Sequence, residues 1–362
     1  MGGPRGRRAT AALRLLVVVL LVAGMPPVRD RIGTVPLLAE AVGAGLPRPF
    51  AAGVELREVT VGGRPADLYD AGGGTPAVVV VPGAAPAGRQ DERVVRLARA
   101  LARSHLTVLV PELDLYGHRF TDADLETLVV AVEHARDRAP LLDVTLIGIS
   151  FGGSLALVTA ADTRVAGDVG TVATFGAYAD MAHLVQAAAT GVSVVGGVEH
   201  RWPPPPQARD ALDRLALELV PPGRRPSLDA ALRGAADPAA LPPDARAAHD
   251  LVTMTDPGDL AVRLAALAPQ ARERLARFSP SAVADDVRAD VLVLHSRDDP
   301  AVPYAELLRM RRAFPGARTF SVESFVHVDL SVDGGLPALA RDLWTTWRFG
   351  GAVLVAARST HL

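Results

Sequence analysis

The residues most able to do chemistry lie near the centre of the chain, in the stretch GISFG at 148–152. This stretch matches the G-x-S-x-G pattern, in which a nucleophilic serine sits on a sharp turn between a strand and a helix. Neighbouring backbone comes so close to such a serine that the positions two before and two after it must lack bulky side chains. Gly148 and Gly152 meet that demand, and apolar runs flank them. The pattern predicts that Ser150 is a nucleophile on an elbow formed by these glycines.

A serine hydroxyl needs a base and a third group that orients the base. Asp298 and Asp299 follow the strand-like run VLVLHS, and His327 follows the next strand-like run, TFSVES. The carboxyl ends of parallel strands meet at one edge of a sheet, and a triad in the chain order serine, acid, histidine is built there. Either aspartate satisfies this placement.

The elements around these residues alternate between strands and helices. Apolar, β-branched runs predict strands, and segments with helical spacing of apolar residues lie between them; the strands are at 76–81, 106–113, 143–149, 169–178, 289–296 and 317–324. Helical patterns separated by Pro-rich breaks fill 181–285, where we expect no strand. The order predicts an α/β fold, a doubly wound, mostly parallel sheet with a helical cap insertion.

This alternation divides the chain into three parts. We expect a catalytic core at 50–180 and 286–350, with the cap at 181–285 inserted into it. Residues 1–49 form an N-terminal export signal or membrane anchor and its linker.

The N-terminal part begins with a basic stretch and continues with an uncharged apolar run from Leu15 to Val28. A run of this length is short for a membrane-spanning helix and typical of a signal-peptide core. If Arg14 extends toward lipid headgroups, residues 9–28 allow attachment to a membrane. A buried N-terminal helix is the alternative. We expect an exported, extracytoplasmic protein, either secreted or anchored by its N-terminus.

Composition excludes several kinds of chemistry. The 362 residues carry a formal net charge of -2, which gives no electrostatic case for a nucleic-acid partner. Cysteine, lysine and asparagine are absent, so thiolate catalysis, a Schiff-base lysine and a Walker-type phosphate lysine are excluded. Neither a metal nor an organic cofactor is expected.

With these motifs, the chain resembles the α/β-hydrolase superfamily over about residues 50–348, particularly its dienelactone-hydrolase-like and esterase-like members. Aligning HSRDDPAVP with the family segment HGxxDxxVP implies that Asp299 is the acid and Asp298 a turn residue, with Ser296 where glycine is usual. Some members take the acid from the preceding strand end, where Asp180 lies. Dienelactone hydrolases use cysteine as the nucleophile, so the chain departs from them at Ser150.

The resemblance also implies an oxyanion hole built from the backbone N–H groups of Phe151 and Ala84, with Gly83 as the fallback for Ala84. The implied function is a serine hydrolase that cleaves an ester, lactone or thioester of a small-molecule acyl substrate through an acyl-enzyme. The alternatives are a non-catalytic, membrane-tethered binding domain of the same fold, or a peptidase. In the cap, the stretch 197–202 either contacts substrate or forms surface.

Overall fold

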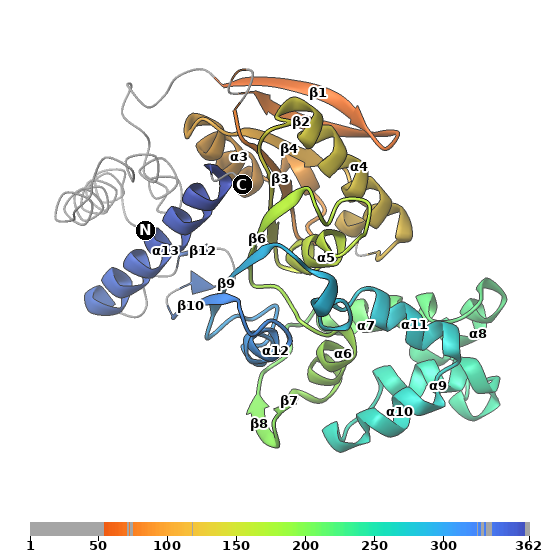
Figure 1. Ribbon diagram of the computed structural model, residues 1–362. Helices are drawn as coiled ribbons and strands as arrows, with labels where there is room; N and C mark the ends of the chain where they lie inside the picture. The colour runs from red at the N-terminus through yellow and green to blue at the C-terminus, as the bar shows by residue number, and fades with distance from the viewer. Residues whose placement is uncertain are drawn as a thin grey trace, which may run out of the picture.

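A mostly parallel sheet runs through the computed structural model of the chain, whose described residues are 54–70, 72, 75–117, 119–323, 325–326, 329–330 and 335–358 (Figure 1). Within that range its eight strands are β1 (Glu55–Val61), β2 (Arg64–Asp70), β3 (Ala77–Val81), β4 (Thr107–Pro111), β5 (Val144–Ile149), β6 (Val169–Phe175), β9 (Asp290–Ser296) and β10 (Arg318–Val322). Their order across the sheet is β1-β2-β4-β3-β5-β6-β9-β10.

The direction of the strands brings several strand ends to one edge. The strands β3, β4, β5, β6, β9 and β10 are parallel, whereas β1 and β2 pair as a hairpin and β2 runs antiparallel to β4. The chain crosses from one parallel strand to the next through helices. The doubly wound, mostly parallel α/β fold predicted from the sequence is therefore confirmed.

The two faces of the sheet are covered by different helices, namely α3 (Glu92–Arg103) and α13 (Gly335–Arg358) on one side and α4 (Asp122–Arg138) and α5 (Phe151–Ala160) on the other. Strand β3 shows why both faces are buried. Val78 and Val80 join the apolar cluster with α3 and α13, whereas Val79 and Val81 join the cluster with α4 and α5. The continuous valine run is thus explained by alternation between two buried faces.

The segment 181–285, which is predicted to be the cap, lies beyond one end of the sheet (Figure 1). It contains α6 (Met181–Thr190), α7 (Ala208–Glu218), α8 (Arg225–Leu232), α9 (Pro243–Val252), α10 (Leu260–Ala266) and α11 (Pro269–Arg277). The prediction that it holds no strand was wrong, because β7 (Val192–Val195) and β8 (Val198–Arg201) form an antiparallel hairpin. Gly196 and Gly197, at φ 63° and 78°, make its two-residue turn.

The remaining elements complete the carboxyl-terminal part. Helix α12 (Ala305–Ala313) connects β9 to β10, and the short strands β11 (Phe325–Val326) and β12 (Asp329–Leu330) pair with each other. Helix α13 continues to Arg358, beyond residue 350, where the predicted core ends. Its second half buries Val353 and Leu354 against the sheet, which explains the extension.

The N-terminal segment at 1–53 lies outside the described residues. The expected export signal or anchor, with membrane attachment through 9–28, therefore stays a prediction. In the part of the chain that the structure describes, no helix combines the length and apolarity needed to cross a membrane.

Candidate active site

Ser150 lies on a strained turn between β5 and α5. Its backbone has φ 54° and ψ -130°, a conformation that favours glycine and that residues with a Cβ adopt at a cost. Its N–H donates to the carbonyl of Phe175 at 2.6 Å, which fixes the turn to the end of β6. A strand that turns into a helix within one residue leaves the serine side chain projecting from the corner.

The flanking glycines are required by close backbone contacts. A Cβ on Gly148 would lie 2.3 Å from the Cα of Gly153, and a Cβ on Gly152 would lie 2.2 Å from the carbonyl oxygen of Pro82. Real Cβ atoms do not approach other atoms this closely, so only glycine fits.

The hydroxyl of Ser150 is not used to cap the helix that follows it. Although Ser150 is the N-cap of α5, its side chain makes no capping hydrogen bond. The residue is buried. Ser150 borders a cavity of about 460 Å³, so the hydroxyl is placed at a void large enough for a small molecule.

Two backbone N–H groups lie beside this serine. Phe151 is the first residue of α5, where amides lack intrahelical acceptors. Ala84 lies in the loop after β3, next to Gly83. A Cβ added to Gly83 would lie only 3.0 Å from the Cβ of Ser150. Ala85 donates back to Gly83 at 2.8 Å, whereas neither Phe151 N nor Ala84 N has a backbone acceptor among the described residues. Both residues line the cavity.

Of the two adjacent aspartates after β9, only one is buried. Asp299 is 2 % exposed, whereas Asp298 is exposed to solvent. The Oδ1 of Asp299 accepts the amides of Ala301 at 2.8 Å and Val302 at 3.0 Å. These bonds hold its carboxylate at the sheet edge where Ser150 lies, and Ala301 itself lines the cavity. The geometry favours Asp299 over its neighbour.

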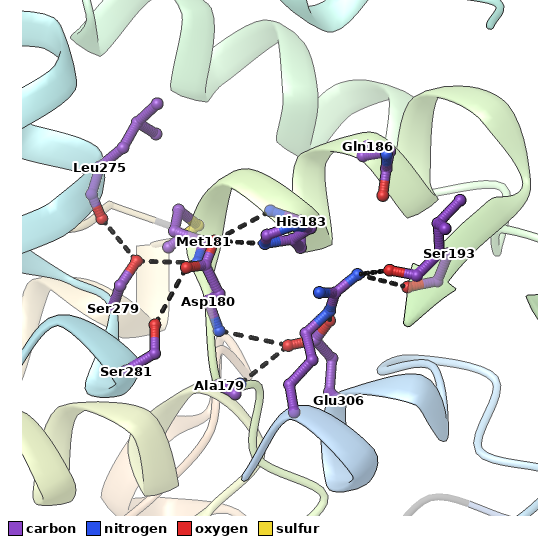
Figure 2. A network of polar contacts seen from close by, with 12 residues as sticks. Ala179, Asp180, Met181, His183, Gln186, Ser193, Leu275, Ser279, Ser281 and Glu306 are labelled. Carbon is purple, nitrogen blue, oxygen red and sulfur yellow. Dashed lines mark hydrogen bonds and ion pairs between the residues drawn. The ribbon is translucent and has the colours of Figure 1, made fainter. Parts of the chain in front are cut away.

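Asp180, the third candidate for the acid, is engaged elsewhere (Figure 2). It is the N-cap of α6: its Oδ1 accepts the N–H of His183 at 3.1 Å, and its Oδ2 accepts the hydroxyl of Ser281 at 2.9 Å. Burial alone would raise the pKa of Asp180, but the hydrogen bonds and charge of His183 and the Ser281 hydroxyl lower it to about 2. One carboxylate oxygen of Asp180 thus caps α6. The other connects this helix to Ser281, near the carboxyl-terminal end of the segment 181–285.

A buried ion pair connects the same region to the core (Figure 2). The Glu306 carboxylate, fully buried on α12, accepts the N–H groups of Ala179 at 2.9 Å and Asp180 at 3.2 Å. Arg309 pairs with Glu306 at 3.1 Å and donates to the carbonyl of Val194 at 2.6 Å. Burial raises the pKa of Glu306, against the opposing charge of Arg309. This network joins α12 to the first helix and the hairpin of the cap.

His327, the predicted base, lies outside the described residues. Its role as base therefore stays a prediction. Within the described residues no cluster of three or more histidine, aspartate or glutamate side chains is arranged to hold a metal ion.

The cavity walls were not predictable from the motifs. They come from the loop carrying Phe120, from one face each of α6 and α7, and from Trp202, which follows β8. Trp202 is buried, and its indole N–H donates to the backbone carbonyl of Asp299 at 2.8 Å. Of the stretch 197–202, then, the tryptophan reaches the site, whereas Val198 is exposed. The sequence feature that could have pointed to Trp202 is an aromatic residue directly before a run of prolines.

Comparisons with known proteins agree with this fold. The family model described as alpha/beta hydrolase fold matches residues 76–333. A curated relative, the 2-hydroxy-6-oxo-2,4-heptadienoate hydrolase of Pseudomonas putida, is 28% identical over 264 residues, which are 71% of this chain and 83% of the relative.

Solved structures that match the chain are distant in sequence. Est1E from Butyrivibrio proteoclasticus is 13% identical with a TM-score of 0.48, over 83% of this chain and 98% of that one. A meta-cleavage product hydrolase from Pseudomonas fluorescens is 16% identical with a TM-score of 0.42, over 82% and 97%. The assignment of this chain to a family rests on the family model, which covers most of the chain. The chain belongs to the alpha/beta hydrolase family.

Proposed function

We propose that this hydrolase cleaves a carboxylic ester, lactone or thioester through an acyl-enzyme on Ser150. One observation carries the proposal: a buried serine in a strained conformation borders a cavity, and its hydroxyl does not cap the helix that follows it. A residue forced into a glycine conformation is retained where its side chain has a task that glycine cannot do.

The proposed reaction has two halves. Ser150 Oγ attacks the carbonyl carbon of the substrate while His327 takes the hydroxyl proton, and the N–H groups of Phe151 and Ala84 hold the negative charge that develops on the carbonyl oxygen. The alcohol or thiol then leaves with the proton from His327. In the second half, His327 takes a proton from water, the water oxygen attacks the acyl-enzyme, and the acid is released with Ser150 restored.

Asp299 is the proposed orienting acid. Its carboxylate, held by two backbone N–H groups, would accept the second ring N–H of His327 and stabilise the imidazolium that forms. The helix dipole of α5, whose positive end is at Ser150, favours the same negative intermediate.

The test compares variants in the hydrolysis of p-nitrophenyl butyrate. Ser150→Ala and His327→Gln should reduce activity to background, and Asp299→Asn should lower kcat by about 10²–10⁴-fold, the range that general-base catalysis contributes. Asp298→Asn is the matched control and should leave kcat unchanged, because its side chain is exposed. Equal activity of wild type and Ser150→Ala would contradict the proposal and favour a non-catalytic binding domain.

A further inference from the structure

The cavity next to Ser150 is bounded by apolar faces of two cap helices. On α6 the lining residues include Met181, Leu184 and Ala188, and on α7 they include Ala208 and Leu215. Residues spaced by three, four or seven positions share one face of a helix. The ends of each stripe are seven positions apart, so each stripe is about 10 Å long. Two such stripes form an elongated wall, not a pocket for a single small group.

The charged side chains at this cavity are already neutralised by partners. Arg93 binds Asp91 through two hydrogen bonds, of 2.9 and 2.7 Å. Glu218 accepts from Arg274 at 3.1 Å. Apart from these residues, the lining within the described part of the chain carries no charged side chain. A charged group on the substrate would thus lose its water without meeting an unpaired counter-ion, which is costly.

We propose that the substrate carries an uncharged aliphatic chain, which lies between the lining faces of α6 and α7. This inference rests on the proposed function, because it assigns the substrate class of the same site. It sets this protein apart from the curated relative, whose name specifies a heptadienoate, which is a carboxylate. The aliphatic chain of the substrate belongs to either the acyl or the alcohol side of the ester. In both cases the same apolar wall would contact it.

Two series of substrates test the proposal on the full protein. The first lengthens the acyl side, from p-nitrophenyl acetate through butyrate and hexanoate to octanoate; the second lengthens the alcohol side, from ethyl to octyl acetate. In one series kcat/KM should rise by up to about fourfold for each added methylene, the value of burying one CH₂. A flat or falling profile in both series would overturn the proposal.

A charged analogue tests the neutrality of the cavity. The mono-p-nitrophenyl ester of suberic acid has a carboxylate where the octanoate ester has its terminal methyl. If the acyl series shows the rise, this ester should react with a kcat/KM about a hundredfold below that of the octanoate. Hydrolysis as fast as that of the octanoate would contradict the neutral cavity.

A pair of neighbouring alanines on α6 supplies the matched variants. Ala188 lines the cavity, whereas Ala189 is also half-buried but does not line it. Ala188→Leu should lower the ratio of long-chain to short-chain kcat/KM, and Ala189→Leu should leave that ratio at the wild-type value. Equal ratios in both variants, with both proteins folded by circular dichroism, would count against the assigned wall.

Labelling with a fluorophosphonate separates failure of this inference from failure of the proposed function. If Ser150 is labelled but chain length has no effect, the aliphatic-chain proposal is wrong and the serine hydrolase proposal stands. If Ser150 is not labelled and no ester reacts, the proposed function is wrong, and this inference falls with it.

Discussion

Replacing Ser150 with glycine should make the protein more stable than replacing it with alanine. Its backbone, at φ 54° and ψ -130°, is in a region dominated by glycine. Holding a residue with a Cβ there costs about 2–3 kcal/mol, the upper part of the range for such conformations. Alanine keeps the Cβ and this cost, whereas glycine removes it. Both variants lack the hydroxyl, so their difference isolates the backbone strain.

Two smaller effects oppose the gain. Glycine loses about 0.5–1 kcal/mol through its greater freedom in the unfolded chain. It also loses one buried methyl group, worth about 0.8 kcal/mol, because Ser150 is 4% exposed. The net expectation is that Ser150→Gly is more stable than Ser150→Ala by roughly 1 kcal/mol, which follows from these three estimates.

The assay is urea unfolding of both variants under identical conditions, read as the free energy of unfolding. His105 provides the control, since it has φ 60°, is exposed, and does not line the cavity. His105→Gly should likewise be more stable than His105→Ala. If the His105 pair shows this order and the Ser150 pair shows none or the reverse, the strain assigned to Ser150 is refuted.

Three further changes have expected outcomes. Gly152→Ala places a Cβ 2.2 Å from a backbone oxygen and should cost about 3 kcal/mol or more of unfolding free energy, whereas Gly167→Ala, with open space at its Cβ, should stay within about 0.5 kcal/mol of wild type. The pKa of Asp180 is about 2 against 3.8 for an ordinary aspartate, so its charged form stabilises the fold above pH 4, and this stability is lost as pH falls through 2. Asp180→Asn should thus lower the unfolding free energy by about 2 kcal/mol at pH 7 and converge with wild type at pH 2; a constant difference would contradict this. Trp202→Phe removes the donor to the buried carbonyl of Asp299 and should cost about 1–3 kcal/mol in urea unfolding and lower kcat; unchanged stability would show that the bond is dispensable.

The strand–helix alternation and the serine turn were predictable because each follows from local pattern. The valine run of β3 and the two glycines around Ser150 are dictated by contacts within a few residues or across adjacent strands. The hairpin at 192–201 also had a local signal, two glycines between alternating residues, and was missed because its strands are only four residues long.

The shape of the cavity could not be predicted in the same way, and the sequence-based choice between the acids depended on the family resemblance. Asp298 and Asp299 are adjacent and chemically identical, and only burial and backbone hydrogen bonds distinguish them. The cavity walls depend on which faces of α6 and α7 meet, and alanine-rich helices carry little information about that. The bond from Trp202 to Asp299 joins residues 97 positions apart, which no local pattern reports.

The central claim, that Ser150 is an activated nucleophile, is tested most directly by covalent capture. The protein is incubated with a fluorophosphonate, digested, and the modified peptide is identified by mass spectrometry. We expect one adduct, on Ser150, formed rapidly in wild type and lost in Ser150→Ala, with slower formation in Asp299→Asn but not in Asp298→Asn. Absence of an adduct in the folded wild-type protein, or an adduct that persists in Ser150→Ala, would contradict it.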